Sequence, residues 1–549
     1  MEVLFNMTME ELIAENERLK MEAILKDKEL LAKQAMIDDQ KLRIDYLTAD
    51  IAIMRDKKYG KSSEKLGKRF PDLFNYETFN EAEENTNPNE PEPSFDETEE
   101  KTVSFKVKNK KNKNLINRIK NIETQEIIHD LPEDEKICKA CGSQMELIGY
   151  NTVEKLHYVP SKLKKVIHKY PKYMCKPCNE DEITNVVTSK CELPFPKTMI
   201  DSSIVANIMV EKYVKHVPLY RQEKLFKNIG LDVSRINLSN WFLAGADYLK
   251  PLFDLMHKDI KQNDIVLMDE TTLNVLEIKN REKCYIWVMN SSKYDIPIKL
   301  YFYRENHKHK NIPELLEGAK VKYIQSDAYD GYTKLDGVTS VFCNAHSKRK
   351  YADIVKISNV VKAKGNTIDV VDNLAAQGVT YINRLYSVER RLAKKGAGLD
   401  EIYEVRNTES KAILDEYKDW LEEYVDVIPP KSKLGEAMAY SYNHFEELSN
   451  YLLDARLNID NNASERMAKV AVLGRKNWLF CDTVRGAEGT CTALSVIETA
   501  LANNLNVFEY LQYVLDRIYV TDTTDEEALR KLLPYSTDLP NYLKVKKSS

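Results

Sequence analysis

The stretch DIVLMDETTLNVLE, residues 264–277, decides how the centre of this chain is expected to fold. It opens with a short apolar run and reaches Asp269 at the end of that run, a pattern typical of a buried strand. Two further strand-like segments follow between residues 283 and 306. After a helix-like segment comes VKYIQSDAYDGY, residues 321–332, in which a fourth strand is expected to end at Asp327. We therefore predict that Asp269 lies on a central first strand and Asp327 at the end of the adjacent fourth strand.

Three strands in hairpin order, a helix and another strand form the opening of a ribonuclease-H-like fold. In that order of elements the two aspartates can face one pocket, although an Asp at a strand end is more often only a turn former. A third carboxylate comes from NIDNNASERMAKVAVLGRKNWLF, residues 458–480, where Glu465 lies on a predicted helix. Asn462 and Glu465 also fit a capping box at the start of that helix. Both interpretations of Glu465, metal ligand and cap, stay open on the residues alone.

Two aspartates on strands and a glutamate on a helix suit phosphoryl transfer on DNA. Magnesium prefers hard oxygen ligands, and two ions about 4 Å apart can activate the attacking oxygen and stabilise the leaving one. A basic cluster follows the second aspartate in VFCNAHSKRKYAD, residues 341–353. Its members are expected to contact DNA phosphates: His346, Lys348, Arg349 and Lys350.

Length and composition limit the class of protein. A chain of 549 residues is too long for one hydrophobic core, so we expect three or more domains. It is 43% hydrophobic and 30% charged, and no apolar run approaches the roughly 20 residues of a membrane span. The net charge of −5 argues against a uniformly basic nucleic-acid binder, but the charge is segregated along the chain. We expect a cytoplasmic bacterial protein without a membrane partner.

The N-terminal segment carries apolar residues in a heptad pattern over residues 9–54, without Pro or Gly. This pattern predicts a coiled coil that joins copies of the chain, with Asn16 at an a position that fixes register. A long amphipathic helix folded on its own domain is the alternative. An acidic stretch at 81–100 and a basic run at 106–120 then indicate a disordered linker.

Four of the nine cysteines form two CxxC pairs, which are typical of a structural zinc site. Each pair makes a tight turn that can aim two sulfur atoms at one ion, and four thiolates leave no open position for catalysis. A redox CxxC pair and incidental thiols are the alternatives. The predicted ligands of one Zn²⁺ are Cys138, Cys141, Cys175 and Cys178.

A helical region follows at residues 199–250. Gly230 lies in a short turn, and Ser234 is a plausible N-cap for the next helix. The spacing suits a helix-turn-helix, which predicts Arg235, Asn237 and Ser239 as groove-facing candidates. Helix pairs joined by a Gly turn are also common in proteins that do not read DNA.

Several motifs together resemble the transposases of the insertion sequence 66 family. They occur in the family's order: KYGKSSEKL, the two CxxC pairs, HVPLYRQEKLF, LMDETTLNVLE, SDAYDGY, CNAHSKRKY and DNNASERMAKVAVLGRKNWLF. The resemblance implies a DDE catalytic core in which Asp269, Asp327 and Glu465 bind two Mg²⁺ or Mn²⁺ ions. It also implies an N-terminal leucine zipper, a zinc-binding domain, a helical insertion before the Glu, and small accessory proteins as partners. Where many such enzymes carry a base seven residues after the Glu this chain has Val472, so Arg475 and Lys476 are the predicted DNA contacts.

These observations predict a multidomain chain of mixed α+β and α/β class. The expected parts are a coiled coil (1–66), a linker (67–122), a zinc-binding domain (123–195), a helix-turn-helix-like domain (196–258), the first part of the core (259–352), a helical insertion (353–455) and the completion of the core (456–549). The expected function is that of a homo-oligomeric DNA transposase, which cleaves the 3′ ends of its element and joins them to target DNA. Two alternatives stay open: a nuclease or resolvase of the same fold without strand transfer, and a non-catalytic zinc-containing DNA-binding regulator.

Overall fold

The computed structural model describes residues 8–59, 163–169, 172–174, 186–188, 193–196, 198–278, 283–332, 335–362 and 369–545. Contacts divide the chain into two units, one of Met1–Arg69 with Ile167–Val545 and one of Phe70–Val166 with Lys546–Ser549. The predicted linker and the four predicted zinc ligands lie outside the described residues. Within the described ranges, no helix combines the length and apolar composition needed to cross a membrane.

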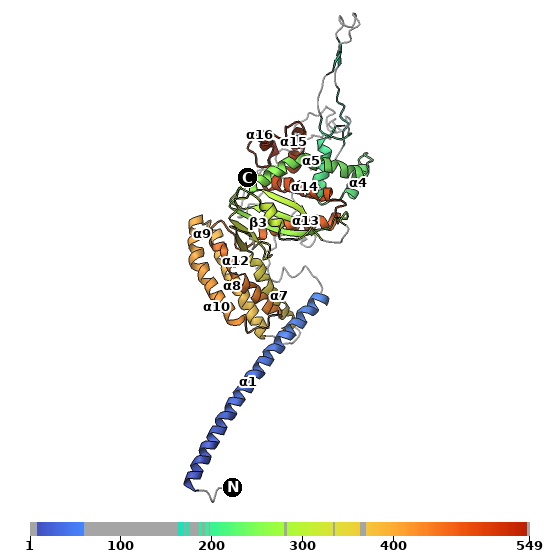
Figure 1. The fold of residues 1–549 in the computed structure, drawn as a ribbon. Helices are drawn as coiled ribbons and strands as arrows, with labels where there is room; N and C mark the ends of the chain where they lie inside the picture. The colour runs from blue at the N-terminus through green and yellow to red at the C-terminus, as the bar shows by residue number, and fades with distance from the viewer. Residues whose placement is uncertain are drawn as a thin grey trace, which may run out of the picture. The chain divides into compact units, whose positions relative to one another are not determined.

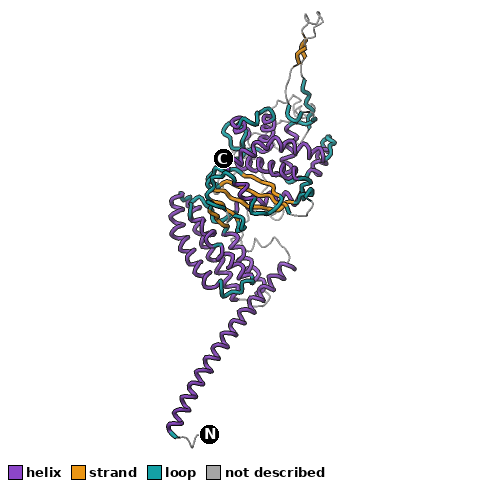
Figure 2. Tube along the Cα trace, in the orientation of Figure 1, coloured by secondary structure: helices purple, strands orange, loops and turns teal. Residues whose placement is uncertain are grey.

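A five-stranded mixed sheet forms the centre of the first unit (Figure 2). Its strands are β3 (Ile265–Leu273), β4 (Cys284–Ser291), β5 (Lys299–Arg304), β6 (Tyr323–Ser326) and β7 (Thr339–Phe342), in the order β5-β4-β3-β6-β7. The pairs β3–β4 and β4–β5 are antiparallel, whereas β3–β6 and β6–β7 are parallel. The predicted central position of β3 beside the fourth strand is therefore confirmed.

The parallel pairing of β3 with β6 is short, and this is what opens space for a site. The register runs from Ile265↔Tyr323 to Leu267↔Gln325 and stops there. Beyond this point β3 continues, paired only with β4, and Asp269 lies opposite Val288. The two strands therefore separate just before the predicted carboxylates, where hydrophobic strand residues give way to polar ones.

The free edge of the sheet at β5 is covered by α14 (Val484–Ala502) rather than by another strand. Ser495 Oγ accepts a hydrogen bond from the Tyr301 amide at 2.8 Å, and Thr499 Oγ1 accepts from the Lys299 amide at 3.0 Å. These side chains give the edge strand the partners that a neighbouring strand would otherwise supply, which also blocks edge-to-edge association.

Two further helices pack on the sheet (Figure 1). α13 (Asn462–Trp478) packs on β3 and β4, and its Met467 carbonyl accepts from the Tyr301 hydroxyl at 3.2 Å. α5 (Arg235–Ile260) contacts β5, where Phe253 and Phe302 make an edge-on ring contact with centroids 5.3 Å apart. The short α6 (Asn311–Leu316) connects β5 to β6.

The helical region before the sheet belongs to the same hydrophobic core. α3 (Ser202–Tyr213) and α4 (Leu219–Asn228) precede α5, and Gly230 takes a φ of +93° in the turn between α4 and α5. Ser234 caps α5 through a hydrogen bond from the Asn237 amide, as predicted. Buried side chains of α3 and α5 pack with those of the sheet, including Met209, Leu238 and Phe242.

The segment between β7 and α13 is helical, as predicted for an insertion. It contains α7 (Asn344–Lys362), α8 (Asp369–Lys395), α9 (Leu399–Val405), a π-helix at Arg406–Ser410, α10 (Lys411–Tyr424), α11 (Lys433–Asn443), α12 (Phe445–Ser449) and a 3-10 turn at Asn450–Leu452. A second hydrophobic cluster joins these helices to the sheet, with Leu385 and Leu414 packed against Ile265 and Leu267. The buried Arg406 guanidinium pairs with Glu389 at 2.7 Å and reaches the Tyr451 carbonyl.

The remaining elements lie at the two ends. α1 (Met9–Tyr59) ends one residue before Gly60, close to the predicted end, and leaves Leu19, Leu30 and Ile44 exposed. Two short antiparallel strands, β1 (Lys172–Met174) and β2 (Val186–Thr188), lie within the predicted zinc-binding domain. The C-terminal part contains α15 (Val507–Ile518), α16 (Glu526–Arg530) and a 3-10 turn at Asn541–Leu543. Self-association through α1 remains a prediction.

Replacing Ser495 with Ala tests the cover of the sheet edge. The substitution leaves the Tyr301 amide buried without its acceptor, so the free energy of unfolding should fall by about 1–3 kcal/mol. Ser387→Ala is the matched control. Both serines donate to the carbonyl four residues earlier in their own helix, but Ser387 is exposed and bonds to no strand edge in the described part of the chain. Urea unfolding measures both; equal losses in the two variants would show that the edge contact adds no stability.

Candidate active site

Asp269 and Asp327 lie where β3 and β6 separate. Asp269 is in the second half of β3, and its Oδ1 accepts a hydrogen bond from the following amide, that of Glu270, at 2.8 Å. Asp327 directly follows β6, and its buried Oδ1 has no hydrogen-bond partner among the described residues. Both carboxylates are half-buried, and in the described part of the chain neither forms an ion pair and one has an unpartnered oxygen.

The pKa values of both aspartates are raised. Burial is the main cause of the rise for Asp269, to about 8, and the negative charges of Glu270, Asp327 and Glu465 add to it. Burial also raises the pKa of Asp327 to about 6, with further contributions from Glu270 and Glu465. Glu465 contributes to both shifts, but its ligand-type neighbours within 4.8 Å are Cys343 and His346 rather than the two aspartates.

This set of donors fits a hard divalent cation. Carboxylate oxygens are the ligands that Mg²⁺ prefers, and a bound cation would stabilise the ionised form of both aspartates, which burial disfavours. The donors of Asp269 and Asp327 fit such an ion, and Glu465 remains the predicted third ligand.

The capping box predicted for Glu465 is wrong. α13 begins at Asn462, so its N-cap is Asn461, and the Asn461 side chain makes no capping hydrogen bond. Its Nδ2 instead donates to the Met268 carbonyl on β3 at 2.7 Å. The Asp460 carboxylate accepts from the Asn462 amide at 3.2 Å and so satisfies part of the helix start. The Asn461 side chain, at the position that usually caps a helix, therefore bonds to β3 instead of to the helix.

Asn461 connects three parts of the site, and sequence analysis gave it no role. Besides the side-chain bond to Met268, the Asn461 backbone amide donates to Cys343 Sγ at 3.2 Å. Cys343 lies directly before α7. The neighbouring Asp460 accepts from the Tyr386 hydroxyl of α8 at 3.0 Å. The mouth of α13 is therefore tied to β3, to the start of α7 and to the insertion. Its only sequence signal was the run of amides and acids before Glu465.

Glu465 faces basic and soft side chains of the neighbouring elements. Its carboxylate lies 3.6 Å from His346 Nδ1, 3.4 Å from Arg349 and 4.0 Å from Lys469. The Glu465 side chain is only 11% exposed, whereas that of Arg349 is 45% exposed. His346 and Arg349, predicted as DNA contacts, are thus brought to the third carboxylate. Burial lowers the pKa of His346, although the charge of Glu465 opposes this change.

The other predicted DNA contacts are distributed around the site. The amino groups of Lys348 and Lys350 lie 5.4 Å and 4.5 Å from the ring centroids of Tyr386 and Tyr440. Arg475 donates to the carbonyl and the hydroxyl of Thr272 on β3, whereas Lys476 is exposed. Arg235 and Asn237 are exposed at the start of α5, and neither side chain bonds or pairs with the carboxylates in the described part of the chain.

A fourth carboxylate, Glu270, directly follows Asp269 on β3 and has partners of its own. Glu270 is bonded to His307 Nε2 at 2.8 Å and to the Tyr332 hydroxyl at 2.9 Å. Its charge nevertheless helps to raise the pKa of both Asp269 and Asp327. Both partners, His307 and Tyr332, come from distant segments, and no local pattern around Glu270 indicates them.

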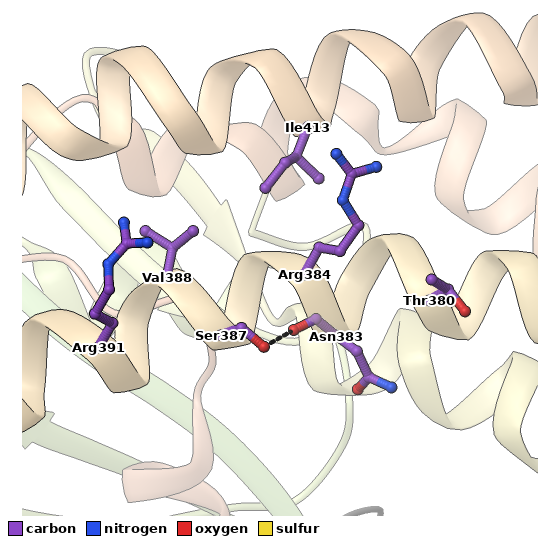
Figure 3. Close-up of a pocket in the computed structure, with 7 residues that line it drawn as sticks. All are labelled: Thr380, Asn383, Arg384, Ser387, Val388, Arg391 and Ile413. Carbon is purple, nitrogen blue, oxygen red and sulfur yellow. Dashed lines mark hydrogen bonds between the residues drawn. The ribbon is translucent and has the colours of Figure 1, made fainter.

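Two cavities lie outside the carboxylate cluster. Figure 3 shows a groove of about 380 Å³ between α8 and α10, where Arg384 and Arg391 extend from α8. These arginines pair with Glu416 and Glu409 at 2.6 Å each, so their charge is neutralised locally. A second cavity, about 350 Å³, adjoins the start of α13 and is lined in part by polar and basic residues: Asn290, Lys293, Asn458, Asp460, Asn462 and Arg466.

Comparison with known proteins defines the class as transposase. The chain matches the sequence profile described as "Transposase IS66 family" over residues 197–489, more than half of its length. It also matches the zinc-finger binding domain of IS66 transposases at 135–179 and the IS66 C-terminal element at 495–535. The chain belongs to the IS66 transposase family. Membership implies DNA binding, and the zinc-finger match supports a structural zinc ion.

Relatives from Sinorhizobium fredii cover most of the chain. The uncharacterized protein y4hP is 28% identical over 435 residues, 75% of each chain. The uncharacterized protein y4jD is 27% identical over 424 residues, which are 73% of this chain and 78% of the relative. The similarity therefore covers about three quarters of the chain, and the names of these relatives assign no activity.

The raised pKa of Asp269 predicts that Asp269→Asn stabilises the magnesium-free protein. The folded state holds this proton up to about pH 8, whereas the unfolded chain releases it near the ordinary value of 3.8, so wild type loses stability as the pH rises through this window. Asn removes the charge, so its advantage should grow with pH and reach at least about 1.4 kcal/mol at pH 8.5, the free energy of one pKa unit.

Thermal melting in magnesium-free buffer with zinc retained measures this difference. Asp254→Asn, at an exposed carboxylate on α5, is the control and should melt like wild type across the pH range. Added Mg²⁺ should stabilise wild type more than Asp269→Asn. If the melting temperatures of wild type and Asp269→Asn fall equally as the pH rises, the raised pKa assigned to Asp269 is wrong.

Proposed function

We propose that this chain is an active DNA transposase with a ribonuclease-H-like core, which cleaves the 3′ ends of its own element and joins them to target DNA. The observation that carries the proposal is the pair of half-buried aspartates where β3 and β6 separate, with raised pKa values to which Glu465 contributes. A protein keeps uncompensated buried carboxylates at a cost in stability, and perturbed groups of this kind concentrate at functional sites. The strand order and the family membership support the same proposal.

In this proposal Asp269, Asp327 and Glu465 hold two Mg²⁺ or Mn²⁺ ions. When bound, such ions stabilise the charge on the attacking and leaving oxygens of a phosphodiester. The protein's own part is to position the three carboxylates and to keep negative charge beside them. Asn461 does this by joining the mouth of α13 to β3, and Glu270, held by His307 and Tyr332, keeps negative charge beside Asp327.

Basic side chains around the carboxylates would bind the DNA backbone. Lys348 and Lys350 lie on α7 next to the aromatic rings of the insertion, and Lys476 is exposed at the end of α13. We add Arg466 and Lys293, both exposed and both lining the cavity beside α13. Phosphate contacts of this kind orient DNA without reading its sequence. Arg235 and Asn237 remain proposals for sequence recognition.

The N-terminal parts would assemble the complex. Two element ends need two active sites, so α1 is proposed to pair protomers through its exposed apolar a and d positions. The four cysteines Cys138, Cys141, Cys175 and Cys178 would fold the zinc domain around one ion.

Glu465→Gln tests the catalytic proposal. The amide keeps the size of the side chain but removes the charge that attracts a divalent cation, so strand cleavage and strand transfer should both fall by roughly 100-fold or more. DNA binding, measured by mobility shift on the element's ends, should remain. Glu416→Gln, at an exposed ion pair on α10, should keep wild-type activity.

Products of the same assay separate the alternatives. Joined strands from wild type exclude a nuclease that only hydrolyses DNA. Wild-type rates in Glu465→Gln would contradict the assignment of Glu465 as a catalytic ligand. Wild-type protein that binds ends but never cleaves them would favour the DNA-binding regulator.

The oligomer proposal has its own test in α1. Ile37→Lys with Ile44→Lys places charge at two a positions, which should separate the protomers in sedimentation. Met21→Lys with Ile24→Lys makes the same chemical change at outer heptad positions, and this pair should keep the oligomer. All four side chains are exposed within one chain, so neither pair disturbs a monomer core. Identical sedimentation of both double variants would contradict a coiled-coil seam at these positions.

A further inference from the structure

Three different metal-binding side chains converge beside the aspartate pair. Cys343 directly follows β7, His346 lies in the first turn of α7, and Glu465 lies in the first turn of α13. The ligand atoms of these three residues all lie within 4.8 Å of one another. A thiol, an imidazole and a carboxylate form a donor set different in kind from the all-oxygen set of Asp269 and Asp327.

The separations are close to those of a tetrahedral zinc site. Glu465 Oε1 lies 3.9 Å from Cys343 Sγ and 3.6 Å from His346 Nδ1. With Zn–S near 2.3 Å and Zn–N or Zn–O near 2.0 Å, tetrahedral angles place such ligand pairs roughly 3.3–3.5 Å apart. The ligand atoms of Cys343 and His346 lie within 4.8 Å of each other, so a movement on the order of 1 Å would let one ion contact all three atoms, with a fourth position left open.

The nitrogen that would bind the ion has no other partner. His346 Nδ1 is buried and accepts or donates no hydrogen bond among the described residues, although most buried polar atoms have a partner. Cys343 is 1% exposed, and its sulfur already accepts from the Asn461 amide. An amide donor to sulfur is typical of the support that metal-bound thiolates receive from neighbouring groups.

We propose that Cys343, His346 and Glu465 form a binding site for a soft divalent cation of the zinc class, separate from the zinc finger. Soft sulfur and imidazole ligands favour Zn²⁺ over Mg²⁺, whereas the aspartate pair favours Mg²⁺. Binding releases the thiol proton to solvent and leaves Cys343 as a thiolate. Glu465 is shared between the two donor sets, so an ion held by Cys343 and His346 withdraws this carboxylate from Asp269 and Asp327.

The consequence is inhibition of the proposed reaction by free zinc. This consequence rests on the proposed function, whereas zinc binding itself does not. In wild type, zinc should inhibit magnesium-dependent cleavage at concentrations that have little effect on Cys343→Ser. Serine keeps the shape and an acceptor for the Asn461 amide but is a poor zinc ligand.

Zinc content of the full-length chain is the direct test. After equilibration with buffered free zinc, wild type should hold about one equivalent more than Cys343→Ser and His346→Gln, because each variant lacks one ligand while the finger stays loaded. Cys491→Ala is the matched control, since Cys491 is also buried and free but lies on α14, and it should match wild type. Cobalt substitution adds a second readout. The wild type should show thiolate-to-cobalt absorption from the finger and from Cys343, whereas Cys343→Ser should keep only the absorption of the finger.

The outcomes separate this site from the catalytic proposal. Equal zinc content and equal cobalt absorption in wild type, Cys343→Ser and His346→Gln would overturn the site, even in an active enzyme. Extra zinc lost in both variants supports the site, even if the protein neither cleaves nor joins DNA. Circular dichroism and melting of each variant exclude loss of zinc through misfolding, and His346→Gln serves if Cys343→Ser does not fold.

Discussion

One hydrogen bond, from Asn461 Nδ2 to the Met268 carbonyl, fixes the relation between the two halves of the candidate site. Met268 precedes Asp269 on β3, and Asn461 precedes the helix that carries Glu465. The whole helical insertion lies between β7 and α13 in the sequence, so α13 must be brought back to the sheet by tertiary contacts. Asn461 is 1% exposed, and a lost partner at such depth costs about 1–3 kcal/mol. This contact therefore positions the carboxylates and stabilises the packing of α13 on β3.

The second constraint is electrostatic. Asp269 and Asp327 are held in a half-buried space where burial and Glu270 both oppose their ionisation. Glu465 is in a different environment, paired with Arg349 and close to Lys469 and His346. The site thus consists of an acidic pair without ion-pair partners among the described residues and a third carboxylate that already has basic neighbours. A divalent cation would have to compete with those neighbours for Glu465, and this competition also underlies the proposed inhibition by zinc.

The sheet and the two aspartates could be predicted because their signals are local. The apolar run before Asp269 and the strand before Asp327 define their own elements, and hairpin order then places β3 at the centre. Ser234 was correctly predicted as an N-cap for the same reason. The cap of α13 was predicted one residue late because the Asn461 side chain bonds to β3 instead of its own helix. The partners of Glu270 and Glu465 come from segments far away in sequence, and no local pattern encodes such contacts.

The proposed function requires Asp269, Asp327 and Glu465 to converge on shared metal ions. Anomalous X-ray diffraction from crystals of the full chain soaked in Mn²⁺ tests it most directly, because manganese can replace magnesium at oxygen sites and its position is then observed. We expect anomalous peaks contacted by Asp269, Asp327 and Glu465, about 4 Å apart where both ions bind. Peaks elsewhere, with the three carboxylates free of manganese at saturating concentration, would contradict it.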